Sequence, residues 1–130
     1  MAKIARTPFN ASRMLTGGIS SDIVLSDKTK GYTYFVTASS AVAINVNYTD
    51  KGSYYKFILK SDSTAEITIQ VPSLVALVIS DDAGVSVVEG TGTTITIPSG
   101  AKAGTYVDLL CDGSKWYARG MSASSTFVIS

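Results

Sequence analysis

The side chains that could do chemistry in this sequence are ten carboxylates, one thiol and seven tyrosine hydroxyls. The sequence has no histidine, so it cannot form a Ser-His or Cys-His nucleophilic site and lacks the commonest transition-metal ligand. The one cysteine, Cys111, cannot form a disulfide within the chain. It shares the apolar face of a predicted strand with Val107 and Leu109, which indicates a buried free thiol rather than a reactive one.

The carboxylates show no catalytic spacing. Asp81 and Asp82 fall in a predicted turn and could offer oxygens to calcium, but the spaced ligands of an EF-hand loop are absent, which favours a solvated turn. Two suitably placed carboxylates would suffice for a glycosidase, and the sequence neither excludes nor supports that pairing. We therefore predict a non-enzymatic protein with no catalytic residue, no cofactor and no metal site.

The seven tyrosines are the most informative feature of the composition. Tyr54 shares a strand face with Lys56 and Lys60, and Tyr32 shares a face with Tyr34. Tyrosines on outward faces suit protein interfaces or sugar platforms, whereas tyrosines on inward faces belong to the core. Both readings stay open at each position.

Length and composition indicate one domain that assembles with other chains. The 130 residues contain only 16% charged side chains, below the usual ~25%, and the net charge of +1 offers no basic footprint for nucleic acid. No apolar stretch is long enough to span a membrane. The first residues carry no secretory pattern, so we expect synthesis in a reducing cytoplasm.

Short alternating strands predict an all-β fold over residues 19–130. Ile67, Ile69 and Val71 alternate with polar residues, and Pro72 is expected to end that strand. Residues 74–79 are continuously apolar, which predicts a strand buried on both faces, and residues 89–92 read as a turn. We expect a single antiparallel β-sandwich or jelly-roll-like barrel of about eight to ten strands.

Residues 1–18 differ from the rest and are predicted to form an extended basic arm. Three positive charges precede the first acid, Asp22, and the apolar residues follow no strand period. Gly17 and Gly18 would provide a flexible joint. A disordered tail is the alternative. We expect the arm to bind a partner through Lys3, Ile4, Arg6, Phe9, Arg13 and Leu15.

The stretch from Thr94 to Gly120 predicts a closing hairpin. An I-T-I strand ends at Pro98, residues 106–111 form the next strand, and Asp112-Gly113 is a signal for a primed two-residue turn. The chain returns as residues 115–119 and Gly120 ends this strand, in which we expect Trp116 to be largely buried. Trp116 and Tyr117 are also what an ordinary hairpin would contain.

The sequence I-P-S-G followed by G-T-Y-V-D-L-L-C-D-G-S-K-W-Y-A-R-G resembles the closing hairpin of small β-domains in tailed-phage virion proteins. Those include capsid decoration (cement) proteins, head fibres and tail-fibre modules. The resemblance implies a structural protein of the capsid surface, assembled in the host cytoplasm, that forms a homotrimer and binds the major capsid protein through its arm. The alternative is a receptor- or carbohydrate-binding domain of a tail or head fibre.

Overall fold

The computed structural model describes residues 16–81 and 84–130 of the chain, and the strands within them form one sheet. A short 3-10 helix, η3 (Asp27–Thr29), lies between the second and third strands. The strands are β1 (Thr16–Ile19), β2 (Ile23–Leu25), β3 (Thr33–Val36), β4 (Val42–Val46), β5 (Tyr54–Leu59), β6 (Ile67–Asp81), β7 (Val85–Ile97), β8 (Tyr106–Cys111), β9 (Trp116–Ala123) and β10 (Val128–Ile129). The all-β prediction is confirmed.

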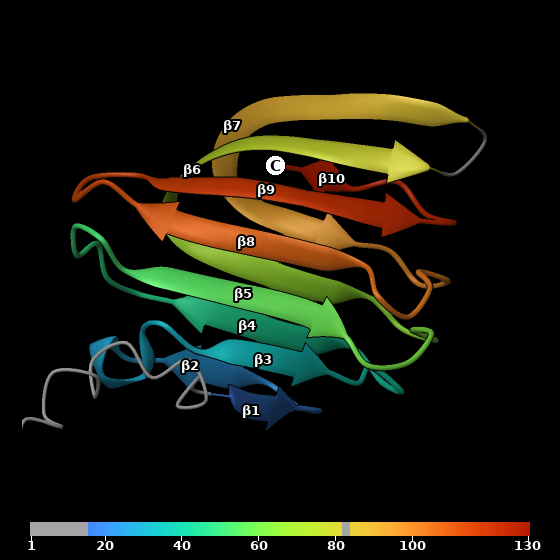
Figure 1. Ribbon diagram of the computed structural model, residues 1–130, viewed down its shortest axis with the longest axis horizontal. Helices are drawn as coiled ribbons and strands as arrows, with labels where there is room; N and C mark the ends of the chain where they lie inside the picture. Colours follow the sequence, from blue (N-terminus) through green and yellow to red (C-terminus); the bar gives the residue numbers. More distant parts are fainter. Residues whose placement is uncertain (1–15, 82–83) are drawn as a thin grey trace, which may run out of the picture.

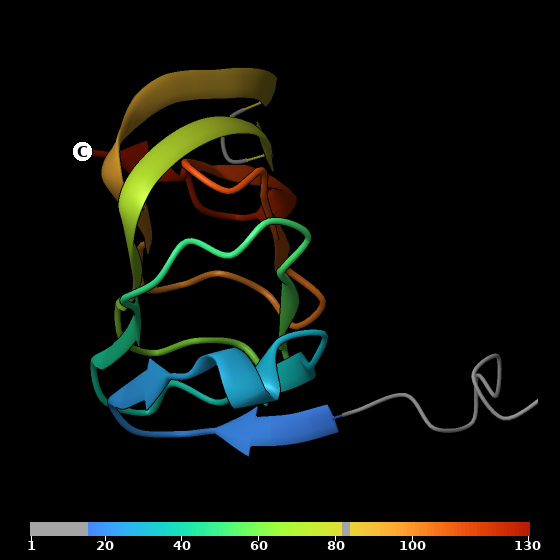
Figure 2. The same ribbon diagram turned by 90° about the vertical axis from the view of Figure 1, so that its left-hand side faces the viewer.

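The sheet folds over on itself into two layers and forms a nearly closed barrel (Figures 1 and 2). The front layer contains β1, β3, β5, β8 and β9, and the back layer contains β2, β4 and β10. The long strands β6 and β7 belong to both layers. Residues 67–70 of β6 pair with β4 at the back, whereas residues 74–81 pair with β9 at the front. This is the sandwich or barrel that the strand pattern predicts.

The sheet is mixed, which corrects the expectation of a purely antiparallel fold. In the N-terminal half the chain alternates between the layers, so β1, β3 and β5 stack in parallel at the front and β2, β4 and β6 stack in parallel at the back. A strand that returns to its layer by way of the opposite layer arrives running in its original direction. In the C-terminal half, hairpins join β6 to β7 and β8 to β9 as antiparallel pairs, while β6 and β9 pair in parallel.

Alternate residues of both layers point inward and form one core. An aromatic cluster fills one part of it, with the Tyr55 ring stacked 6.0 Å from Phe57 and 5.9 Å from Trp116. Trp116 is buried, and its Nε1 donates a hydrogen bond of 2.8 Å to the Tyr48 carbonyl oxygen. The predicted burial of Trp116 and of Cys111 is confirmed.

Three local predictions on β6 and β7 are wrong, two of them because these strands bend across the top of the barrel instead of stopping (Figure 2). β6 continues through Pro72, where its register against β7 shifts between Gln70 and Leu74. β7 continues through residues 89–92, where a turn was predicted. Residues 74–79 are not buried on both faces, since Leu77 is 52% exposed and Ile79 is 42% exposed.

The β8–β9 hairpin is present, but its turn differs from the prediction. Cys111 pairs with Trp116, which leaves a loop of residues 112–115 instead of a two-residue primed turn. Only Gly113 in this loop has a positive φ, +104°. The Asp112 Oδ1 atom accepts hydrogen bonds of 2.8 Å from the backbone N–H groups of Ser114 and Lys115. These bonds lower the pKa of Asp112 to about 2.

The arm proposed from the sequence lies mostly outside the described residues. Its six predicted binding residues all fall in residues 1–15, which the structure does not describe. Residues 16–18, which we also assigned to the arm, belong to β1. Gly17 and Gly18 therefore pair with β3 in the sheet.

Candidate functional site

The outward side of the front layer, which we call the front face, is the candidate functional site. On β5, β8, β9 and the second half of β6, one set of alternate residues is buried in the core and the other set points outward. Strand register then places outward residues of neighbouring strands side by side. Three cross-strand rows of side chains result, and each has a distinct chemistry.

The first row is apolar and crosses six strands. It begins at Phe35, which is 40% exposed, and ends at Val87, which is 62% exposed. Monomeric proteins seldom leave so extended an apolar band in water, and such bands mark contact surfaces. In cross-strand order the row is Phe35, Ile58, Tyr106, Met121, Ile79 and Val87.

The second row lines a hollow. Tyr54, Leu110, Tyr117 and Val75 are successive cross-strand neighbours on β5, β8, β9 and β6. The hollow beside them has a volume of about 400 Å³ and is also lined by Leu77, Ala118 and the two charged residues Asp108 and Arg119. The Tyr117 hydroxyl donates a hydrogen bond of 3.0 Å to the Asp112 Oδ2 atom, which holds this ring in the row.

The third row is charged and lies between the other two. Lys56, Asp108 and Arg119 are cross-strand neighbours on β5, β8 and β9. Lys56 Nζ lies 5.2 Å from the centre of the Tyr106 ring. In the described part of the chain, the one ion pair within 4.0 Å joins Lys102 to Asp62, so neither cation of this row is paired with Asp108.

Asp108 is the unusual member of this row. Its Oδ1 atom is buried and has no hydrogen-bond partner. Burial raises the pKa of the Asp108 carboxyl, although Lys56 and Arg119 act in the opposite direction. Burial, followed by the charge of Asp108, also raises the pKa of Tyr54. A half-buried carboxyl that lies between two cations without an ion pair to either can accept a further hydrogen bond or ion pair.

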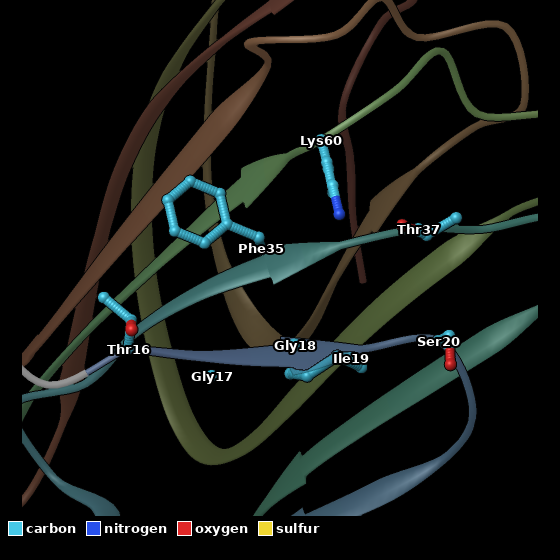
Figure 3. Close-up of a pocket in the computed structure, with 8 residues that line it drawn as sticks. All are labelled: Thr16, Gly17, Gly18, Ile19, Ser20, Phe35, Thr37 and Lys60. Atoms are coloured by element: carbon cyan, nitrogen blue, oxygen red, sulfur yellow. The ribbon is translucent and has the colours of Figure 1, made fainter.

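An open groove extends the front face to its lower edge (Figure 3). Gly18 of β1 is the cross-strand neighbour of Phe35 and adds no side chain to the apolar row. Figure 3 shows the Phe35 ring and the Lys60 side chain beside this bare stretch of backbone. Thr16, Ser20 and Thr37 complete the lining.

The sequence pattern pointed to only part of this surface. Tyr54 was recognised as an outward tyrosine beside lysine, and the structure places it in the hollow. Tyr34 and Tyr55 belong to the core instead, with Tyr32 and Tyr48 packed against it. Leu110, Arg119 and Met121 were missed, although the alternation of residues 106–110 and 117–121 already places them opposite the buried set.

No group of three or more His, Cys, Asp or Glu side chains in residues 16–81 and 84–130 could hold a metal ion. Within these same residues no helix is long and apolar enough to cross a membrane. Comparisons with protein-family models, with curated proteins and with solved structures gave no match to this chain.

Proposed function

We propose that this protein is a non-enzymatic structural subunit of a tailed-phage particle, specifically a capsid decoration (cement) protein. The observation that carries the proposal is the front face, an outward apolar band on a small all-β domain. The resemblance of the closing hairpin to virion β-domains adds to it, since those residues form the central strands β8 and β9 of that face.

An apolar face of this kind favours assembly for a simple energetic reason. Each Å² of apolar surface removed from water contributes about 25 cal/mol to association. A protein that acts alone gains nothing from leaving such a band exposed, whereas a subunit of a larger particle buries it on assembly. The proposed setting is the capsid surface, reached in the host cytoplasm without membrane or nucleic-acid contact.

In this proposal residues 1–15 attach the protein to the major capsid protein. Lys3, Arg6 and Arg13 would be drawn to acidic groups of the shell, and Ile4, Phe9 and Leu15 would add apolar burial. A segment of this length reaches about 50 Å when fully extended, enough to cross onto a neighbouring subunit. The resemblance implies three copies around each attachment point.

Deletion of residues 2–15 tests the arm. We expect the shortened protein to keep its β-type circular dichroism and its melting temperature, and to remain in the supernatant when particles lacking the protein are pelleted. The full chain should pellet with them. A charge-reversed control, Lys3→Glu with Arg6→Glu and Arg13→Glu, keeps the length of the arm and should also fail to bind. Unchanged pelleting of the shortened protein would contradict the proposal.

The hollow on the front face favours a second candidate function, binding of a sugar or receptor by a fibre domain. The rings of Tyr54 and Tyr117 could pack on the C–H face of a sugar, while Asp108 and Arg119 bond its hydroxyls. A glycan array would distinguish the two functions. Binding of a glycan that is lost in Tyr117→Ala and kept in Gln70→Ala, on the opposite side of the barrel, would favour the fibre domain.

A further inference from the structure

The central strands of the front face carry a pattern that is complementary to itself. Consider a two-fold axis that runs along the strands, midway between β8 and β9. It would set the front faces of two copies against each other, with β8 opposite β9 of the second copy and β5 opposite β6. This rotation leaves each residue at the same position along the strand direction, so each side chain faces a side chain of the same row in the second copy.

The two central residues of the charged row become paired under this symmetry, while Lys56 on β5 lies opposite Leu77 on β6 of the second copy. Asp108 lies opposite Arg119 of the second copy, and Arg119 lies opposite its Asp108, because the two are cross-strand neighbours on β8 and β9. An axis along β8 would set Asp108 against Asp108, and an axis along β9 would set Arg119 against Arg119. An axis across the strands would set every charge of the row against its own copy. Of these placements, only the one between β8 and β9 brings opposite charges together.

The apolar side chains match under the same operation. Tyr106 meets Met121 of the second copy in the first row, and Leu110 meets Tyr117 in the second row. One strand further out, Ile58 on β5 meets Ile79 on β6. Each contact joins an apolar group to an apolar group, so the exposed band of each copy is covered by that of the other.

From these observations we infer that the front face binds the front face of a second copy of this chain, with reciprocal Asp108–Arg119 ion pairs across the two-fold axis. The Asp108 carboxyl has already lost part of its hydration within one chain, so pairing it costs less desolvation than pairing a fully hydrated carboxylate. The contact is separate from the arm and does not depend on shell binding.

The contact should be of modest size. Figure 2 shows that the layers curve over the top of the barrel, which limits a face-to-face contact to the central strands. Four strands at about 4.8 Å spacing span roughly 20 Å, so the area that this contact buries falls at the small end of specific interfaces. We therefore expect a reversible dimer that dissociates at micromolar concentration.

Sedimentation equilibrium of the full chain between about 10 and 500 µM tests this inference in the range expected for a small interface. We expect a monomer–dimer equilibrium. Asp108→Arg and Arg119→Asp should each weaken the dimer by at least about tenfold, because each sets like charges against each other. The double variant Asp108→Arg with Arg119→Asp should recover most of the affinity, since the reciprocal pairs return in exchanged form. Gln70→Arg, on the opposite side of the barrel, should leave the dimer unchanged.

A purely structural role of Asp108 would not predict recovery in the double variant. If Asp108→Arg does not fold, Asp108→Asn and Met121→Glu test the charged and apolar rows separately, and each should weaken the dimer. A monomer at every concentration would overturn the inference, as would a trimer that Asp108→Arg leaves intact or a double variant no better than the single ones. Particle binding by the Asp108→Arg protein tests attachment through the arm, so loss of the dimer and loss of particle binding are separate outcomes.

Discussion

The two outer faces of the barrel are built on the same strand pattern and carry opposite chemistry. In both layers, alternate residues enter the shared core, as Val107 and Leu109 do at the front and Ile67 and Ile69 do at the back. The outward residues of the back layer are mostly small or polar, and its two exposed valines, Val24 and Val128, lie on the edge strands β2 and β10. In cross-strand order its central rows are Ala43, Thr68 and Thr96, and Asn45, Gln70 and Thr94.

This difference distinguishes the side chains that folding requires from those that it does not require. Folding requires the inward half of each strand to be apolar and places little demand on the outward half. The back face shows that threonine, asparagine and glutamine serve the outward positions of this barrel well. The tyrosine, leucine, isoleucine and methionine side chains of the front face are therefore not required to form the core, and we propose that they contact another molecule.

The largest expected effect tests whether the two layers share one core. Trp116 lies on the front layer, and its Nε1 bonds the carbonyl of Tyr48, in the segment that joins β4 of the back layer to β5. Trp116→Ala should lower the free energy of unfolding by about 3–5 kcal/mol, because it leaves a large cavity and an unpaired carbonyl. Urea denaturation measures this loss. A loss below about 1 kcal/mol would mean that the layers are stabilised separately.

A smaller effect is expected at Gly120, where the backbone of β8 leaves no room for a side chain on β9. A Cβ atom at Gly120 would collide with the Tyr106 carbonyl oxygen, whereas one at Gly18 would meet only the Phe35 carbonyl oxygen at 4.0 Å. Gly120→Ala should therefore lower the free energy of unfolding by about 1–3 kcal/mol through overpacking. Gly18→Ala is the matched control and should change it by less than about 0.5 kcal/mol. Equal effects in urea denaturation would contradict the assigned strand pairing.

Lysine substitutions compare the two faces directly. Met121→Lys on the front face and Gln70→Lys on the back face each place a charge at an exposed position. Both should change the free energy of unfolding by less than about 0.5 kcal/mol, because neither side chain is part of the core. Only Met121→Lys should reduce self-association, as measured by light scattering at high protein concentration. Equal behaviour of the two variants would remove the distinction between the faces.

The smallest effect concerns the loop that positions Tyr117 at the end of the front face. Asp112 accepts bonds from Lys115, Ser114 and Tyr117, and its pKa of about 2 lies below the ordinary value of about 3.9. A lowered pKa in the folded state means that the stabilisation is present above about pH 4 and is lost as the pH falls toward about 2. The stability difference between the wild type and Asp112→Ala should therefore be constant above about pH 5 and shrink below about pH 4. Thermal melts across this range measure it, and a difference that grows in acid would contradict the assignment.

Local sequence predicted most of the strands, because alternation of apolar and polar residues needs no knowledge of the partner strand. It predicted β4 and β5, the buried positions of Trp116 and Cys111, and the hairpin between β8 and β9. It failed at Pro72 and at residues 89–92, since a proline or a glycine pair permits a bend as readily as a break. Of the candidate site it predicted the outward placement of Tyr54 and of Lys56, which shares its strand face.

The sequence by itself determined the all-β class and, in alternating strands such as β4 and β5, which residues enter the core, because both follow from side-chain period and burial. The tertiary structure decided strand order and direction. The parallel pairs arise from a chain that alternates between layers, and no local pattern distinguishes that path from a series of hairpins. It also decided that Lys56 stands in one row with Asp108 and Arg119, since Lys56 and Asp108 lie far apart in the chain on strands that no hairpin joins, and their register is set only in the assembled sheet.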